Sequence, residues 1–221
     1  MQTSAFRLPV LMHRLGGTGL KTRLLHPHDA FWDHRLAIDT VGYKPDRGLH
    51  SDPDWRCHYS PTAYREIFRM LTHVQLGPRD VFVDLGCGLG RAVFAASQLG
   101  ARRAIGVEID EELADGARAN QRRSRLKERD IEFACLGAEA FTPTGCTVVF
   151  IYNAFGAGTL QAVVDHLTAD VARNPRDVRI VYFNPTFDTV LERSEGLTRF
   201  DHWTKPPERH PVSFWRMAPR H

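Results

Sequence analysis

From residue 81 onward, short apolar runs alternate with longer stretches whose apolar residues recur every three or four positions. Residues 81–85, rich in β-branched and aromatic side chains, predict a strand covered on both faces, and residues 90–99 predict the helix that follows it. The alternation continues with strands predicted at 104–108, 131–135, 147–151 and 178–183, and helices at 111–127 and 160–171. This order predicts a parallel sheet with right-handed crossovers.

After residue 184 the alternation stops. Residues 197–203 and 212–217 predict two strands without a helix between them, which favours an antiparallel pair at the far edge of the sheet. Residues 61–74 predict a helix before the sheet, with Ser60 as its cap and Pro61 in its first turn. The predicted fold is α/β: a doubly wound, mostly parallel seven-stranded sheet with an antiparallel C-terminal strand pair and an N-terminal helical extension.

The composition fits one domain without a membrane segment. The chain of 221 residues has no apolar run near the roughly 20 residues that span a bilayer. Its four cysteines form no CxxC pair, which favours a reduced, cytoplasmic location. His26 and His28 form the tightest histidine pair, but they have no cysteine or carboxylate at ligand spacing, so we expect no metal site.

The start of the chain is basic, with four Lys or Arg residues before its first acid, Asp29. Such a start is typical of a transit peptide, of a mobile basic arm, or of an extension packed loosely on the domain. The net charge of +3 permits an anionic partner without requiring one. If nucleic acid binds, these N-terminal residues are better candidates than the basic residues within 118–129, which fit a solvated helix face.

The predicted strand at 81–85 runs directly into Gly86, Gly88 and Gly90. Glycines at alternate positions let the backbone turn sharply and approach a ligand where a Cβ would collide. Asp84 places a negative charge in the same crevice, and the N–H groups at the start of the next helix favour an anionic group. Glu108 ends the following strand, where a carboxylate can accept hydrogen bonds from both hydroxyls of a ribose.

The spacing of the glycines distinguishes between two kinds of ligand, a dinucleotide with a pyrophosphate and a nucleoside with a sulfonium. A dehydrogenase loop reads G-x-G-x-x-G, whereas this one reads G-x-G-x-G with an acid two residues before the first glycine. Asp84 would repel a pyrophosphate and attract a ligand that carries an ammonium and a sulfonium. A tight turn without any ligand is the remaining alternative.

Residues 84–90 followed by Glu108 resemble motif I and its successor in class I AdoMet-dependent methyltransferases. Residues 59–64, 106–108 and 153–156 extend the resemblance to the non-SET histone-lysine methyltransferases, and residues 152–155 and 182–185 to their uncharacterised bacterial relatives. The resemblance implies S-adenosyl-L-methionine (AdoMet) as cofactor, with residues 59–64 folded over it. The cofactor-binding residues that it implies are Tyr59, Thr62, Asp84, Gly86, Cys87, Gly88, Gly90, Glu108, Glu139 and Asn153.

Two positions depart from the family pattern. An acid usually follows the glycine after the third strand and reaches the adenine amino group, whereas Gly137 is followed here by Ala138. Either Glu139 substitutes, or stacking and backbone groups hold the adenine. The family's Asn-Pro or Asn-Asn pair after the fourth strand is replaced by Asn153 and an alanine, which leaves the shape of the acceptor pocket open.

Methyl transfer from a sulfonium is a direct displacement, so the protein mainly has to align donor and acceptor. Asn153 can accept a hydrogen bond from an amine, and Tyr152, Phe155 and Tyr182 can form an aromatic wall that favours a cation. We therefore predict Asn153, Tyr152 and Tyr182 as catalytic residues. The alternative is that both tyrosines are core residues.

These inferences predict an N-terminal extension with a cofactor lid at 1–60 and a methyltransferase domain at 61–221. The expected reaction is methyl transfer from AdoMet to a nitrogen of a protein lysine or a small amine. A small-molecule O-methyltransferase and an AdoMet-binding module without turnover are the alternatives, and a dehydrogenase is the last.

Overall fold

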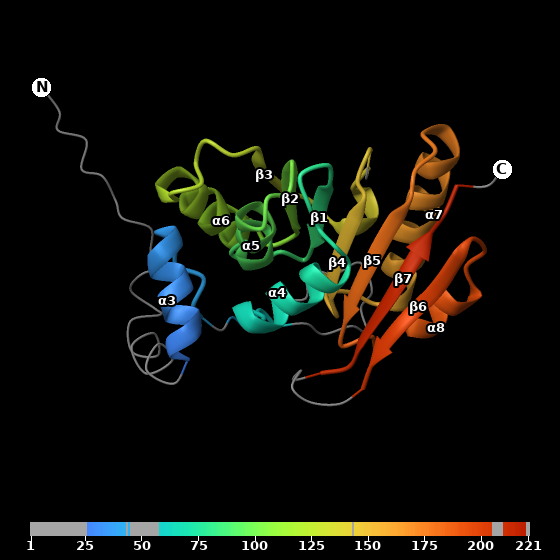
Figure 1. Cartoon of the computed structure of the whole chain (residues 1–221), viewed down its shortest axis with the longest axis horizontal. Helices are drawn as coiled ribbons and strands as arrows, with labels where there is room; N and C mark the ends of the chain where they lie inside the picture. The colour runs from blue at the N-terminus through green and yellow to red at the C-terminus, as the bar shows by residue number, and fades with distance from the viewer. Residues whose placement is uncertain (1–25, 43, 45–57, 143, 205–209, 220–221) are drawn as a thin grey trace, which may run out of the picture.

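One seven-stranded sheet runs through the molecule, with helices on both faces (Figure 1). The computed structural model describes residues 26–42, 44, 58–142, 144–204 and 210–219. Its strands are β1 (Val81–Leu85), β2 (Arg103–Glu108), β3 (Ile131–Cys135), β4 (Val148–Tyr152), β5 (Val178–Phe183), β6 (Leu197–Trp203) and β7 (Val212–Met217). The first five strands are parallel, and β7 lies antiparallel between β5 and β6 in the order β3-β2-β1-β4-β5-β7-β6. The predicted fold class is confirmed.

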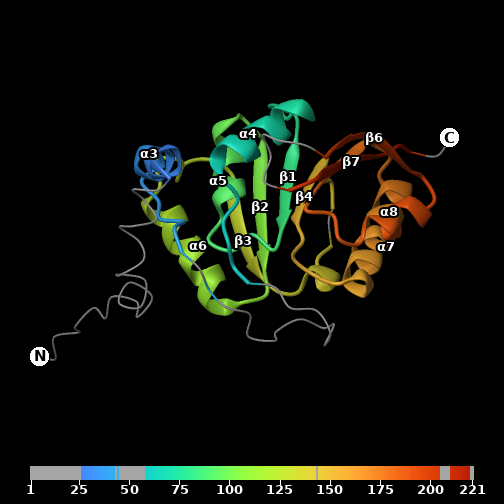
Figure 2. The same ribbon diagram turned by 90° about the horizontal axis from the view of Figure 1, so that it is seen from below.

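The helices form two layers (Figure 2). One layer consists of α3 (Pro27–Leu36), α4 (Tyr64–His73), α5 (Arg91–Gln98) and α6 (Glu111–Arg123); the other consists of the 3-10 turn η1 (Ala138–Ala140), α7 (Ala157–Arg173) and α8 (Asp188–Arg193). Because strand side chains alternate between faces, each layer has its own core. Phe82, Phe150 and Phe183 pack under α4 and α5, whereas Val149 and Tyr182 pack under α7.

The N-terminal part departs most from the predicted elements. Helix α4 begins at Tyr64 rather than at residue 61, and Ser60 does not cap it. The Tyr64 backbone N–H donates instead to Oδ1 of Asp29, at 2.9 Å. Asp29 belongs to α3, a helix that the apolar pattern did not predict because two of its three buried residues are Asp29 and Asp33. Residues 27–36 thus form a helix that is fixed to α4 through a buried acid.

The described residues were searched for a membrane-spanning helix and for a metal site. None of the helices described is both long enough and apolar enough to cross a membrane. The described part of the chain also holds no group of three His, Cys, Asp or Glu residues suited to a metal ion. Within the predicted extension and lid (1–60), residues 1–25, 43 and 45–57 lie outside the described residues.

Candidate active site

Asp84 and Glu108 end neighbouring parallel strands at the same edge of the sheet. Asp84 lies on the face of β1 that carries Phe82, and Glu108 lies on the corresponding face of β2, so both acids point toward the α5 layer. Their side chains are buried, with 4% and 8% of their surface exposed. The register of two adjacent strands therefore gathers two carboxyl groups at one site.

The electrostatics of this pair favour a positively charged ligand. Oε2 of Glu108 accepts from the Gly88 N–H at 2.8 Å and Oε1 from the Asp110 N–H at 2.9 Å, which leaves acceptor capacity on each oxygen. Burial, and then the nearby Glu108, raise the pKa of Asp84 well above its usual value. Burial also raises the pKa of Glu108, against its backbone hydrogen bonds. Within the described residues, no lysine or arginine forms an ion pair with either acid.

The glycine loop is shaped by protein contacts as well as by any ligand. All three glycines have positive φ, at 86° for Gly86, 54° for Gly88 and 90° for Gly90. A Cβ on Gly86 would lie 2.3 Å from the Cβ of Ala154, and one on Gly90 would lie 2.7 Å from the ring of Phe133. These two glycines are thus required by packing. The N–H groups of all three are bonded within the protein, so an anionic group would meet the start of α5 instead.

Tyr59 covers the middle of this loop. A Cβ on Gly88 would lie 2.2 Å from Cε2 of Tyr59, so the tyrosine ring lies directly against that glycine. The Tyr59 hydroxyl donates to the Thr40 carbonyl at 2.7 Å, and its backbone pairs with that of Lys44. Thr62 is buried, and its carbonyl accepts from Nη1 of Arg91, the residue after Gly90, at 3.1 Å. Contact of Tyr59 and Thr62 with a cofactor stays a prediction.

Two other predicted cofactor residues lie near the loop with their side chains directed elsewhere. The Cys87 thiol packs toward Gly106, where a Cβ would be 2.7 Å from its Sγ, and burial raises its pKa well above the usual value. Cys87 can therefore contact a ligand through its backbone alone. The carboxylate of Glu139 folds back over Gly137, just beyond the end of β3, and its contact with an adenine stays a prediction.

The acceptor side differs from the predicted aromatic wall. Tyr152 ends β4 and packs against Phe183 and His210, with ring centroids 4.6 and 5.9 Å apart. Tyr182 lies on the opposite face of the sheet, 1% exposed, where its hydroxyl accepts from the Phe187 N–H at 3.3 Å. Burial raises its pKa to about 12. The wall of Tyr152 and Tyr182 is therefore wrong.

Asn153 follows Tyr152 in a left-handed conformation, with φ of 43°. This strained backbone aims the residue out of the strand at the same edge as the glycine loop, because the next residue, Ala154, touches Gly86. Phe155 packs into the α7 core rather than toward Tyr152. His210 was not predicted, because it lies in a polar, proline-rich stretch whose pattern carries no signal of its position; the antiparallel return of β7 brings it to this edge.

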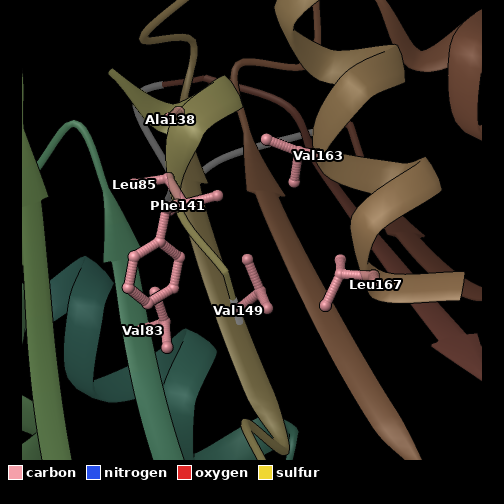
Figure 3. Close-up of a pocket in the computed structure, with 7 residues that line it drawn as sticks. All are labelled: Val83, Leu85, Ala138, Phe141, Val149, Val163 and Leu167. Carbon is pink, nitrogen blue, oxygen red and sulfur yellow. The ribbon is translucent and has the colours of Figure 1, made fainter. Parts of the chain in front are cut away.

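A small internal cavity lies on the other side of the sheet from the acid pair (Figure 3). Its lining is wholly apolar and consists of Val83, Leu85, Ala138, Phe141, Val149, Val163 and Leu167. A nucleoside with charged groups would leave these groups without hydrogen bonds there. The cavity is therefore a packing feature of the α7 layer and not the candidate site.

Comparisons with known proteins agree with this geometry. The sequence profile of the family described as "Histone methylation protein DOT1" matches residues 56–134, which include Tyr59, the glycine loop and Glu108. A ribosomal protein L11 methyltransferase of Serratia proteamaculans is 45% identical over 135 residues, covering 53% of this chain and 46% of that protein. A protein-lysine N-methyltransferase of Saccharolobus islandicus is 40% identical over 63 residues, covering 28% of this chain and 39% of that protein.

This chain has the fold of class I methyltransferases. The fold agrees: an RNA methyltransferase of Salinibacter ruber, solved in complex with S-adenosyl-L-homocysteine, superposes with a TM-score of 0.58 at 23% identity. That match covers 73% of this chain and 96% of the solved chain. The chain spans less than half the length of the first curated relatives that it matches. The activity and cofactor of the whole protein are therefore matters of proposal.

Proposed function

We propose that the chain is an AdoMet-dependent methyltransferase whose acceptor is a nitrogen of a protein lysine or of a small amine. The observation that carries the proposal is the buried pair Asp84 and Glu108 beside the glycine loop, without a cationic partner among the described residues. A sulfonium nucleoside with an ammonium group supplies the missing positive charge. NAD, with its pyrophosphate, would add negative charge at the same place.

Each residue of the site has a distinct task in this proposal. Glu108 accepts hydrogen bonds from the ribose hydroxyls with its remaining lone pairs, and Asp84 attracts the ammonium of the methionine part. Tyr59 covers Gly88 and excludes water. AdoMet, when bound, supplies a methyl group on a positively charged sulfur, and S-adenosylhomocysteine is the product.

The acceptor side then has to present a neutral amine. Asn153 can accept a hydrogen bond from the amine N–H and so direct the nitrogen lone pair toward the methyl group. The Tyr152 ring, backed by Phe183, attracts the ammonium form of the acceptor, which releases one proton to solvent before the methyl transfer. The protein-lysine and ribosomal protein L11 methyltransferases among the relatives support a protein acceptor. Tyr182 has no role here, since it lies on the other face.

Calorimetric titration with AdoMet, S-adenosylhomocysteine and NAD tests the cofactor. We expect both sulfur nucleosides to bind and NAD not to bind. The Glu108→Gln variant should bind AdoMet at least about tenfold more weakly. The Glu132→Gln variant is the matched control, because Glu132 is an exposed acid on the neighbouring strand β3 and should leave binding unchanged. Binding of NAD in place of AdoMet would overturn the proposal.

Incubation with methyl-labelled AdoMet and cell lysate tests turnover. Label in protein that survives acid hydrolysis as methyllysine supports the lysine acceptor, and label in small molecules at oxygen favours the O-methyltransferase alternative. Good AdoMet binding without any labelled product would favour the non-catalytic module. The Asn153→Ala variant should keep its AdoMet affinity and lose about tenfold or more in turnover; unchanged turnover would remove Asn153 from the mechanism.

A further inference from the structure

A buried cluster of charges connects the N-terminal helix α3 to the glycine loop. Its centre is Arg91, which directly follows Gly90, begins α5 and is 5% exposed. Its Nε donates to Oγ1 of Thr40 at 2.7 Å, and its Nη1 donates to Oδ2 of Asp29 at 3.2 Å and to the Thr62 carbonyl at 3.1 Å. One guanidinium thus holds three segments that lie far apart in the sequence.

The acids of α3 complete the cluster. Oδ2 of Asp33 lies 3.8 Å from Nη2 of Arg91 and also accepts from the Thr40 N–H at 3.0 Å. Oδ1 of Asp33 accepts from the Tyr64 hydroxyl at 2.9 Å, and the Arg91 guanidinium lies over the Tyr64 ring at 5.0 Å. Asp29 and Asp33 are 9% and 3% exposed, so the cluster is shielded from water. Loss of one partner would leave the others as uncompensated buried charges.

A short chain of contacts leads from this cluster to the cofactor loop. The Thr40 hydroxyl oxygen accepts a hydrogen bond from Arg91, and the Thr40 carbonyl accepts one from the Tyr59 hydroxyl. The Tyr59 ring lies against Gly88, and Arg91 itself holds the carbonyl of Thr62. Arg91 therefore holds Thr62 directly and Tyr59, which covers Gly88, through Thr40.

We propose that Arg91 is a positioning residue that joins the docking of α3 to cofactor binding. It holds Tyr59 and Thr62 against the glycine loop, so the pocket is complete only when Asp29 and Asp33 of α3 are in place. Residues 27–41 are then part of the cofactor pocket and not an extension separable from a domain at 61–221. The inference rests on the proposed function, because AdoMet is the ligand whose binding it describes.

The test uses the full chain with Arg91→Met, Arg91→Lys and Tyr59→Phe, with the AdoMet dissociation constant from calorimetry and KM and kcat from labelled AdoMet. Arg91→Met should raise the Kd and the KM for AdoMet about tenfold or more while kcat changes much less. Arg91→Lys should restore part of the affinity, because Lys keeps the charge but cannot reach Thr40, Asp29 and Thr62 at once.

Coupling between the two residues separates positioning from general damage. Tyr59→Phe removes the hydroxyl bond to Thr40 and should raise the Kd by a smaller factor. Because Tyr59 depends on Arg91 in this proposal, the double variant should bind no more weakly than Arg91→Met alone. Fully additive effects would contradict the proposal. If Arg91→Met does not fold, the same cycle is run with Asp33→Asn in its place.

Arg176→Met provides the matched control. Arg176 is a partly buried arginine that pairs with a buried aspartate, Asp170, and it lies at the other end of the sheet. The Arg176→Met variant should lower the midpoint of unfolding, as Arg91→Met does, and leave the Kd for AdoMet unchanged. An unchanged Kd in Arg91→Met, or an equal rise in Arg176→Met, would overturn the inference. Failure of the wild-type chain to bind AdoMet would instead overturn the proposed function.

Discussion

Buried acids at the two ends of the parallel strands differ in whether an arginine pairs with them. At the amino end, Asp80 before β1 pairs with Arg179 of β5 and accepts from the Thr147 hydroxyl at 2.8 Å. Asp170 of α7, 1% exposed, pairs with Arg176. At the carboxyl end, Asp84 and Glu108 have no such arginine in the described chain.

The pKa directions record this difference. Burial alone would raise the pKa of Asp170, but hydrogen bonds from Arg176, Asn174 and the Gly145 N–H hold the pKa below its usual value. Burial raises the pKa of Asp84 and of Glu108, and nothing at the carboxyl end offsets it fully. The ion pair of Asp170 at the amino end therefore stabilises the folded chain, whereas burial of Asp84 and Glu108 costs stability, which the proposed ligand would offset.

The largest effect is expected at the amino end. Asp170→Ala removes a buried carboxylate, leaves the partly buried Arg176 without its acid and should lower the free energy of unfolding by about 3 kcal/mol, measured by urea denaturation. AdoMet affinity should not change. Asp165→Ala, an exposed position on the same helix, is the control and should cost little. A loss of AdoMet affinity in Asp170→Ala would mean that the two ends are not independent.

A smaller effect on stability, but a large one on binding, is expected for Gly88→Ala. The new methyl group would collide with the Tyr59 ring in addition to straining a backbone with φ of 54°. Gly100→Ala is the matched control, since its φ is 97° and no atom lies within 4 Å of its Cβ position. Gly88→Ala should be destabilised by about 1–3 kcal/mol more than the control, and it alone should lose AdoMet binding. Equal effects in calorimetry and denaturation would contradict the contact.

Asp84→Asn should stabilise the ligand-free protein. Because the folded-state pKa of Asp84 is raised, the stability linked to its protonated form is present at low pH and is lost as the pH rises through that raised pKa. Asn removes this loss, so the free energy of unfolding at pH 7 should rise by about 0.5–2 kcal/mol and its pH dependence should flatten. AdoMet affinity should fall. Destabilisation at pH 7 would show that Asp84 has a partner in the folded chain.

The smallest effect on stability and turnover is expected for Tyr182→Phe. This variant compares the two faces of the sheet at the carboxyl end. The hydroxyl makes one hydrogen bond, to the Phe187 N–H on the α7 face, so its loss should cost about 1 kcal/mol or less and leave turnover within about twofold. Tyr152→Ala, on the opposite face, should reduce turnover strongly. Comparable loss of turnover in both variants would place both rings at the acceptor.

Much of the cofactor site follows from local sequence. Strand, glycine loop, helix and second strand are consecutive in the chain, and the right-handed crossover places Asp84 and Glu108 at one edge without further information. The predicted strands agree closely with β1 to β7 because continuous apolar runs need cover on both faces. The N-terminal extension was predicted as helical, but the bounds of helix α3 were not, since its buried face is acidic and carries no apolar period.

What the sequence by itself determined is thus the order of elements, the parallel sheet and the acid pair around the glycine loop. Tertiary structure alone decided on which face of the sheet each tyrosine lies and which residues far apart in the sequence are in contact. Ile151 pairs with Tyr182 and Tyr152 with Phe183, so a register between two strands, invisible in either one, separates the two tyrosines. Arg91 meets Asp29 across 62 positions of chain. Such contacts depend on how distant segments pack, and each segment's own pattern is compatible with several packings.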